Sequence, residues 1–157
     1  MGDVPGFSPG GRDLCRYRCE SRAYQTHQAH GVCDKGYVHD FYGIFKNIDP
    51  SLHGSSLESF EEDKRKPCAT LLEYLHGSES FSSKGFCQDL FVKAIAGLEE
   101  IHGASVIHND SRPRNILTLP GYHSPRAVWT DFYVSIVFSG DTSSMLELDL
   151  KGEADGK

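Results

Sequence analysis

The residues best suited to chemistry lie close together in the second half of the chain. They follow the pattern H-x-D-x-x-x-x-N, and a second aspartate comes before a phenylalanine: His108, Asp110, Asn115, Asp131 and Phe132. Carboxylate and amide oxygens suit Mg²⁺, and a carboxylate can also accept the proton of a hydroxyl. Phosphoryl transfer requires both, because it depends on positioning and on neutralising phosphate charge. These residues are therefore of the types that such chemistry needs.

Local sequence signals predict the elements that position these residues. Residues 16–29 contain no glycine or proline and stop before Gly31, a suitable helix C-cap. Residues 86–102 carry apolar side chains at helical spacing, which predicts a second helix ending near Gly103 with one buried face. That face consists of Phe86, Leu90, Phe91, Ala94, Ile95, Leu98 and Ile101. Strands are predicted at 37–45, 68–75, 116–119 and 127–130, with a turn at 120–122 between the last two.

This order of elements and motifs resembles the protein kinases, in particular the divergent protein-kinase-like domains common in fungi. A helix is followed by I-H-N-D-S-R-P-R-N-I-L, a hairpin and an Asp-Phe pair, as in H-R-D-L-x-x-x-N and D-F-G. Upstream, E-S-R-A-Y, F-Y-G and L-L-E-Y-L add weaker similarity, and together the matches span residues 16–138. The resemblance implies an α+β chain with a partial protein-kinase-like fold.

The resemblance also assigns roles within the catalytic loop. Asp110 would orient or deprotonate the acceptor hydroxyl, and Arg112 would steady the transferring phosphate with a planar fork in place of the usual lysine. Asn115 and Asp131 would hold Mg²⁺. His108 would be a structural support beneath the Asp-Phe turn.

Further roles fall on the first half of the chain. Glu73 and Leu75 lie in a stretch that resembles the strand and hinge holding adenine, so ATP is the implied cofactor together with Mg²⁺. Glu20 lies on a helix resembling the one whose glutamate pairs with an ATP-binding lysine. The implied partners are a nucleotide and a protein substrate with a Ser or Thr hydroxyl.

Several features depart from the family pattern. The first lysine is Lys35, which follows Glu20 instead of preceding it, and residues 6–11 do not form a G-x-G-x-x-G loop. Asn109 replaces the usual arginine, and Tyr133 replaces the glycine of D-F-G. Nothing after Ser139 resembles an activation segment. We therefore expect a domain truncated at both ends, with weak activity or none.

The expected organisation is a flexible lead-in at 1–15, a partial kinase-like domain at 16–140 and a polar acidic tail at 141–157. Within the domain, the polar segment 46–67 is expected to be a surface loop. The chain of 157 residues has 16 Lys and Arg against 22 Asp and Glu, a net charge of −6, which argues against nucleic acid. No apolar run is long enough to cross a membrane. Five cysteines without framework spacing favour an intracellular protein, cytoplasmic or nuclear.

Other interpretations of the same residues stay open. Asp110, Asn115 and Asp131 could be ordinary turn residues, Glu20 a solvated glutamate, and residues 73–75 the end of a core strand. A non-catalytic, pseudokinase-like module would share the fold, and small-molecule phosphotransferases of the aminoglycoside or choline type share the catalytic pattern. Zinc is not favoured, because five candidate ligands show no standard spacing: Cys15, Cys19, His27, His30 and Cys33.

Overall fold

Two α-helices and several short strands make up a mixed α+β structure. The computed structural model describes residues 12–81, 87–121 and 123–138. The helices are α1 (Arg16–Ala29) and α2 (Gln88–Gly103), with short 3₁₀ turns η1 (Pro50–Leu52), η2 (Gly54–Ser56), η3 (Glu58–Phe60) and η5 (Pro113–Asn115). The strands are β1 (Phe41–Phe45), β2 (Ala69–Leu72), β3 (Glu79–Ser80), β4 (Val106–Ile107), β5 (Ile116–Leu119), β6 (Arg126–Trp129) and β7 (Ile136–Val137). In this part of the chain no helix is long and apolar enough to cross a membrane.

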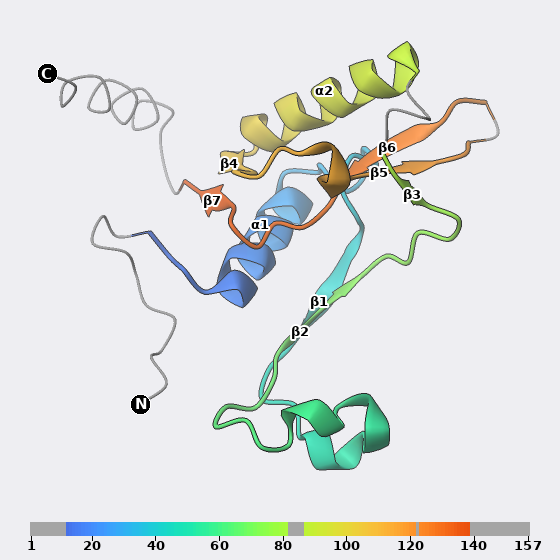
Figure 1. Ribbon diagram of the computed structural model, residues 1–157. Coiled ribbons are helices and arrows are strands. Elements are labelled where there is room, and N and C mark those ends of the chain that lie inside the picture. The colour runs from blue at the N-terminus through green and yellow to red at the C-terminus, as the bar shows by residue number, and fades with distance from the viewer. Residues whose placement is uncertain (1–11, 82–86, 122, 139–157) are drawn as a thin grey trace, which may run out of the picture.

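Within the described ranges the strands form three small antiparallel sheets. These pair β1 with β2, β3 with β5 and β5 with β6, and β4 with β7. The β1–β2 ribbon projects from the rest of the molecule and carries η1, η2 and η3 at its far end (Figure 1). The predicted strand 37–45 is shorter than expected, because Val38 forms a separate parallel bridge to Trp129 before β1 begins.

The core lies where α1, α2 and the strands of the second half meet. Tyr24 of α1, Ile101 of α2 and Phe132 are completely buried, and Trp129 of β6 joins them. The indole Nε1 of Trp129 donates to the carbonyl of Ala94 on α2 at 2.8 Å. This bond satisfies the polar atom of a large buried ring, and it joins β6 to the helix that precedes the H-x-D motif.

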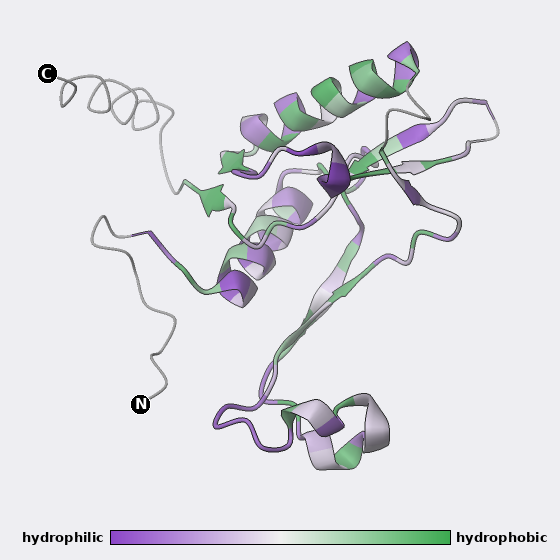
Figure 2. Cartoon of the chain, in the orientation of Figure 1, coloured by the Kyte–Doolittle hydropathy of each residue, from purple (hydrophilic) through white to green (hydrophobic). Residues whose placement is uncertain are grey.

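Helix α1 matches the predicted bounds, and Gly31 follows its C-cap with φ +72°, the left-handed conformation that favours glycine. Helix α2 ends on Gly103, but Ser105 takes the left-handed conformation after it (φ 59°). Its buried face is narrower than predicted, because Phe91 and Ile95 are 47% and 44% exposed. Hydrophobic residues recur along the whole length of α2 (Figure 2), and Phe91, Val92 and Ile95 are exposed in the described part of the chain.

Two described segments lie outside the helices and strands, at 46–67 and at 12–15. Segment 46–67 is mostly exposed and contains η1, η2 and η3. Of the expected lead-in at 1–15, the structure describes residues 12–15. Asp13 accepts two hydrogen bonds from the Arg18 guanidinium, each at 2.8 Å, and one from the Cys15 N–H at 2.9 Å, so it fixes the start of α1. Residues 1–11 and the tail at 141–157 lie outside the described ranges.

Candidate functional site

The ring of His108 connects the two halves of the candidate site. Its Nε2 lies 2.8 Å from the carbonyl oxygen of Thr130, and its Nδ1 lies 3.3 Å from the backbone nitrogen of Asp110. A carbonyl only accepts and an N–H only donates, so the imidazole is neutral with its proton on Nε2. Burial lowers the pKa of His108, which agrees with a neutral ring. The histidine thus holds the Asp110 loop beside the residue that precedes Asp131.

Asp110 and Asn115 form one hydrogen-bonded unit. The amide nitrogen of Asn115 donates to the Asp110 carbonyl at 2.9 Å and to its carboxylate Oδ2 at 3.0 Å. The Asn115 side chain is buried, and its backbone carbonyl accepts the N–H of Thr130 at 2.9 Å. Because the amide nitrogen faces Asp110, the amide oxygen is the atom that Asn115 has left to offer a ligand.

Two arginines bind the carboxylate of Asp110. Arg112 Nε lies 2.8 Å from Oδ1, and Arg114 Nη2 lies 3.1 Å from Oδ2. The hydrogen bond from Arg114 is the main cause that lowers the pKa of Asp110, with Asn115 and the charge of Arg112 acting in the same direction. Asp110 is therefore ionised at neutral pH, as a proton acceptor must be.

Asp131 and Glu20 reach the same neighbourhood from distant parts of the chain. Asp131 follows Thr130 directly and has a left-handed backbone, with φ 65°. Glu20 projects from α1 and accepts the Thr70 hydroxyl at 3.1 Å. Burial raises the pKa of Glu20, and the negative charge of Asp131 adds to this effect. The two carboxylates are thus close enough to repel each other.

Four aromatic rings in successive contact connect the elements that carry the candidate site. Phe41 stacks on Tyr24 with ring centroids 6.3 Å apart, Tyr24 meets Phe132 at 5.2 Å, and Phe132 meets His108 at 4.6 Å. These rings join β1, α1 and the Asp-Phe turn to the H-x-D motif. The spacing of His108 and Phe132 is visible in the sequence, but the contacts of Phe132 with Tyr24 and His27 of α1 are not, because residues so far apart give no periodic signal.

The predicted hinge makes a separate set of contacts. The N–H of Glu73 donates to the Asp40 carbonyl at 2.8 Å, and the Glu73 carbonyl accepts from His39 Nδ1 at 3.0 Å. Its carboxylate lies 3.4 Å from two nitrogens of Arg126. Leu75 is buried, and its carbonyl accepts the N–H of Ser78 at 3.3 Å. The backbone N–H and the backbone carbonyl of Glu73 are thus both hydrogen-bonded within the chain. Nucleotide binding by Glu73 and Leu75 stays a prediction.

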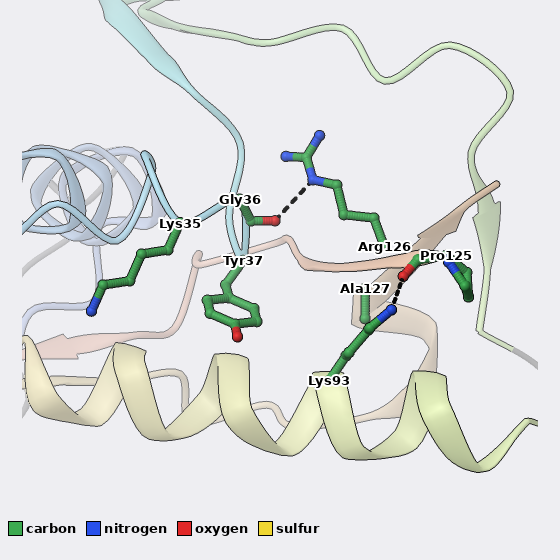
Figure 3. Close-up of a pocket in the computed structure, with 7 residues that line it drawn as sticks. All are labelled: Lys35, Gly36, Tyr37, Lys93, Pro125, Arg126 and Ala127. Atoms are coloured by element: carbon green, nitrogen blue, oxygen red, sulfur yellow. Dashed lines mark hydrogen bonds between the residues drawn. The ribbon is translucent and has the colours of Figure 1, made fainter. Parts of the chain in front are cut away.

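A cavity of about 220 Å³ lies between α2, β6 and the segment before β1. It is lined by Lys35, Gly36, Tyr37, Lys93, Pro125, Arg126 and Ala127 (Figure 3). Arg126 Nε donates to the Gly36 carbonyl at 3.0 Å, and Lys93 donates to the Pro125 carbonyl, as the dashed lines show. The predicted site residues do not line this cavity.

Comparison with known proteins adds no identification: no protein-family model matches the chain, and no curated protein matches it. Among the residues that the structure describes, no group of three or more His, Cys, Asp or Glu side chains is placed to hold a metal ion. His27, one of the zinc candidates, packs its ring against Tyr24 and Phe132.

Proposed function

We propose that the chain is a protein-kinase-like domain that binds Mg-ATP, with Asp110 as the base that receives the acceptor hydroxyl. One observation carries the proposal. His108 bonds the backbone on both sides of the site, at Asp110 and at Thr130 next to Asp131. Ordinary turn residues would require no such link between a loop and a turn 22 residues apart. The linked arrangement supports a functional unit, and it agrees with the order of motifs in the sequence.

The available donors fit magnesium. The Asn115 amide oxygen and the Asp131 carboxylate are hard oxygen ligands, and Mg²⁺ is commonly held by one or two carboxylates together with substrate phosphates. The lack of a three-residue cage among the described side chains is compatible with that mode, because the nucleotide supplies the remaining ligands. When bound, the metal would neutralise phosphate charge.

Residues of the chain would accept the proton, position the loop and attract the phosphate. Asp110, held ionised by its arginine and asparagine partners, would accept a hydrogen bond from the acceptor hydroxyl and take its proton as the phosphate is transferred. Asn115 would hold Asp110 in place through two hydrogen bonds, while Arg112 would attract the transferring phosphate. Neutral His108 has both ring nitrogens engaged, so it would position the loop and not carry the proton.

The proposal is tested by thermal unfolding of the full chain with and without Mg-ATP. Saturating ligand stabilises a folded protein by about 2.7 kcal/mol at one hundred times Kd, so we expect a clear rise in Tm. Asp131→Ala should abolish the rise, and Asp63→Ala, an exposed aspartate in the 46–67 connection, should leave it unchanged. No rise at millimolar Mg-ATP would refute the proposal.

A non-catalytic binding module is the second candidate, and one observation favours it. Glu20 is bonded to the Thr70 hydroxyl and lies near another carboxylate, whereas in the kinase pattern it would pair with lysine. Transfer of labelled phosphate from ATP to a serine peptide separates the candidates. The catalytic proposal expects transfer that Asp110→Asn removes while the Mg-ATP rise in Tm persists; the binding module expects the rise in Tm without transfer.

A further inference from the structure

Two arginines contact the Asp110 carboxylate, the group that would accept the proton of the acceptor hydroxyl. Arg112 and Arg114 bind opposite oxygens of Asp110, at 2.8 and 3.1 Å. Pro113 lies between them and starts η5, so the two arginines leave the backbone on either side of one tight turn. One carboxylate therefore meets two guanidinium groups, so these three side chains together carry one net positive charge.

Both guanidinium groups remain accessible from outside. The side chain of Arg112 is 66% exposed and that of Arg114 is 63% exposed, whereas that of Asp110 is only 19% exposed. Arginine carries five N–H donors in a planar fork, and each of these arginines uses one nitrogen to reach Asp110. Planar forks of this kind bind carboxylates and phosphates through paired hydrogen bonds. The pair thus presents an anion-binding surface beside the reacting position.

The same ion pairs restrict which acceptor can approach. A hydroxyl that bonds to Asp110 competes there with a guanidinium group and weakens or displaces it, because Arg112 contacts Oδ1, while Arg114 and Asn115 share Oδ2. A neutral acceptor offers the displaced guanidinium only water. An acceptor with a neighbouring anionic group offers it a new charged partner, so displacement costs less.

We infer that the acceptor is an acidic peptide, a serine or threonine flanked by anionic groups that Arg112 and Arg114 bind. This inference rests on the proposed function for the identity of the reacting hydroxyl, but the peptide contact can be measured without nucleotide. The surface requires only an anion, so flanking carboxylates and a flanking phosphate are two possible sources of it.

Binding is measured on the full chain by fluorescence anisotropy with labelled serine peptides, in low salt and without ATP. The flanking residues are aspartate, phosphoserine, alanine or lysine. We expect the anionic peptides to bind about tenfold more tightly than the alanine peptide and the lysine peptide to bind weakest, because paired charge-assisted hydrogen bonds are strong. Binding of the aspartate peptide alone assigns carboxylates as the anion, and binding of the phosphoserine peptide alone assigns phosphate.

Charge-matched variants separate a specific site from general attraction. Arg112→Gln/Arg114→Gln should remove the preference for anionic peptides, while Lys64→Gln/Arg65→Gln removes two exposed positive charges elsewhere and should preserve it. Equal affinity for all peptides, no binding at millimolar peptide, or equal losses in both double variants would overturn the inference. A failed Mg-ATP test with intact anion preference would refute the catalytic proposal alone.

Discussion

The Nε2 atom of His108 and the carbonyl oxygen of Thr130 lie 2.8 Å apart, although 22 residues separate them in the chain. This bond crosses from the segment after α2 to the end of β6. Because the other ring nitrogen of His108 accepts the Asp110 N–H, one buried side chain fixes the position of two acidic residues relative to each other. The candidate site thus depends on a tertiary contact as much as on the motifs.

Replacing His108 with leucine should destabilise the fold. The substitution keeps an apolar volume of similar size but leaves the Thr130 carbonyl and the Asp110 N–H without their partner. We expect a loss of about 2–4 kcal/mol in the free energy of unfolding, measured by urea denaturation. His102→Leu, at an exposed position in the last turn of α2, is the control and should change stability little. Similar values for both variants would contradict a structural role for the buried ring.

Elements with strong local signals can be predicted from the sequence. The bounds of α1 follow from a run without glycine or proline and from the C-terminal glycine, and β5 was predicted with its observed ends. The short pair of β4 and β7 was not predicted, because two-residue strands carry no readable alternation. The wide apolar face predicted for α2 failed at Phe91 and Ile95, since hydrophobicity does not show which part of a face a neighbour covers.

Some features of the candidate site can also be predicted from the sequence, and others cannot. The spacing of Asp110, Asn115 and Asp131 could be read from the sequence, and the structure links Asp110 and Asn115 directly. The two arginine bonds to Asp110 and the nearness of Glu20 to Asp131 could not, because charged side chains choose partners only after the backbone has folded.

Gly97 of α2 should resist substitution by alanine. A Cβ there would lie 3.0 Å from the Tyr37 ring and 3.1 Å from the Trp129 ring, both packed against the helix. Alanine normally stabilises a helix by about 1 kcal/mol relative to glycine, but here we expect a net loss of about 1–3 kcal/mol from overpacking. Gly103→Ala, where nothing lies within 4 Å, is the matched control and should be neutral or stabilising. Thermal unfolding of both variants tests this prediction. A more stable Gly97→Ala variant would show that the rings of Tyr37 and Trp129 shift to make room for the added methyl group.

Acidification should destabilise the protein through His27 before most carboxylates titrate. His27 is completely buried, and burial lowers its pKa to about 3. Below the ordinary histidine pKa of about 6.5, the unfolded chain takes up a proton that the folded state refuses, so stability falls as pH decreases toward 3. Burial also lowers the pKa of His39 and of His108, which act in the same direction.

The contribution of His27 to this pH dependence of stability is measured by urea unfolding of His27→Leu and of the original chain between pH 7 and pH 5. Their difference in unfolding free energy should change by roughly 1 kcal/mol per pH unit below pH 6.5. His53→Leu, at an exposed position, should leave the pH dependence unchanged. A difference that does not vary with pH would mean that His27 is not the neutral buried group described here.

The cost in stability of replacing Gly36 should depend on the side chain of Arg126. Gly36 has φ +76°, and a Cβ there would lie 3.1 Å from Arg126 Nε, whereas Gly77 has φ +72° with nothing within 4 Å. Alanine at either position pays about the same backbone strain, roughly 1 kcal/mol. Gly36→Ala should cost more, because it also disturbs the guanidinium that holds Glu73. Repeating both substitutions with Arg126→Ala should remove the excess cost, and an unchanged excess would exclude Arg126 as its source.

Neutralising Glu20 should stabilise the fold while weakening the proposed site. Its pKa is raised by burial and by Asp131, so the charged form is unfavourable in the folded state above the ordinary glutamate pKa. Glu20→Gln retains an oxygen to accept the Thr70 hydroxyl, and we expect the free energy of unfolding to rise at pH 7. The gain should shrink as pH falls and Glu20 becomes protonated, whereas exposed Glu62→Gln should show neither effect. If Glu20 faces a cation in the working site, the same variant should reduce the Mg-ATP rise in Tm. Stability and ligand response would then change in opposite directions, which a solvated or purely structural glutamate would not produce.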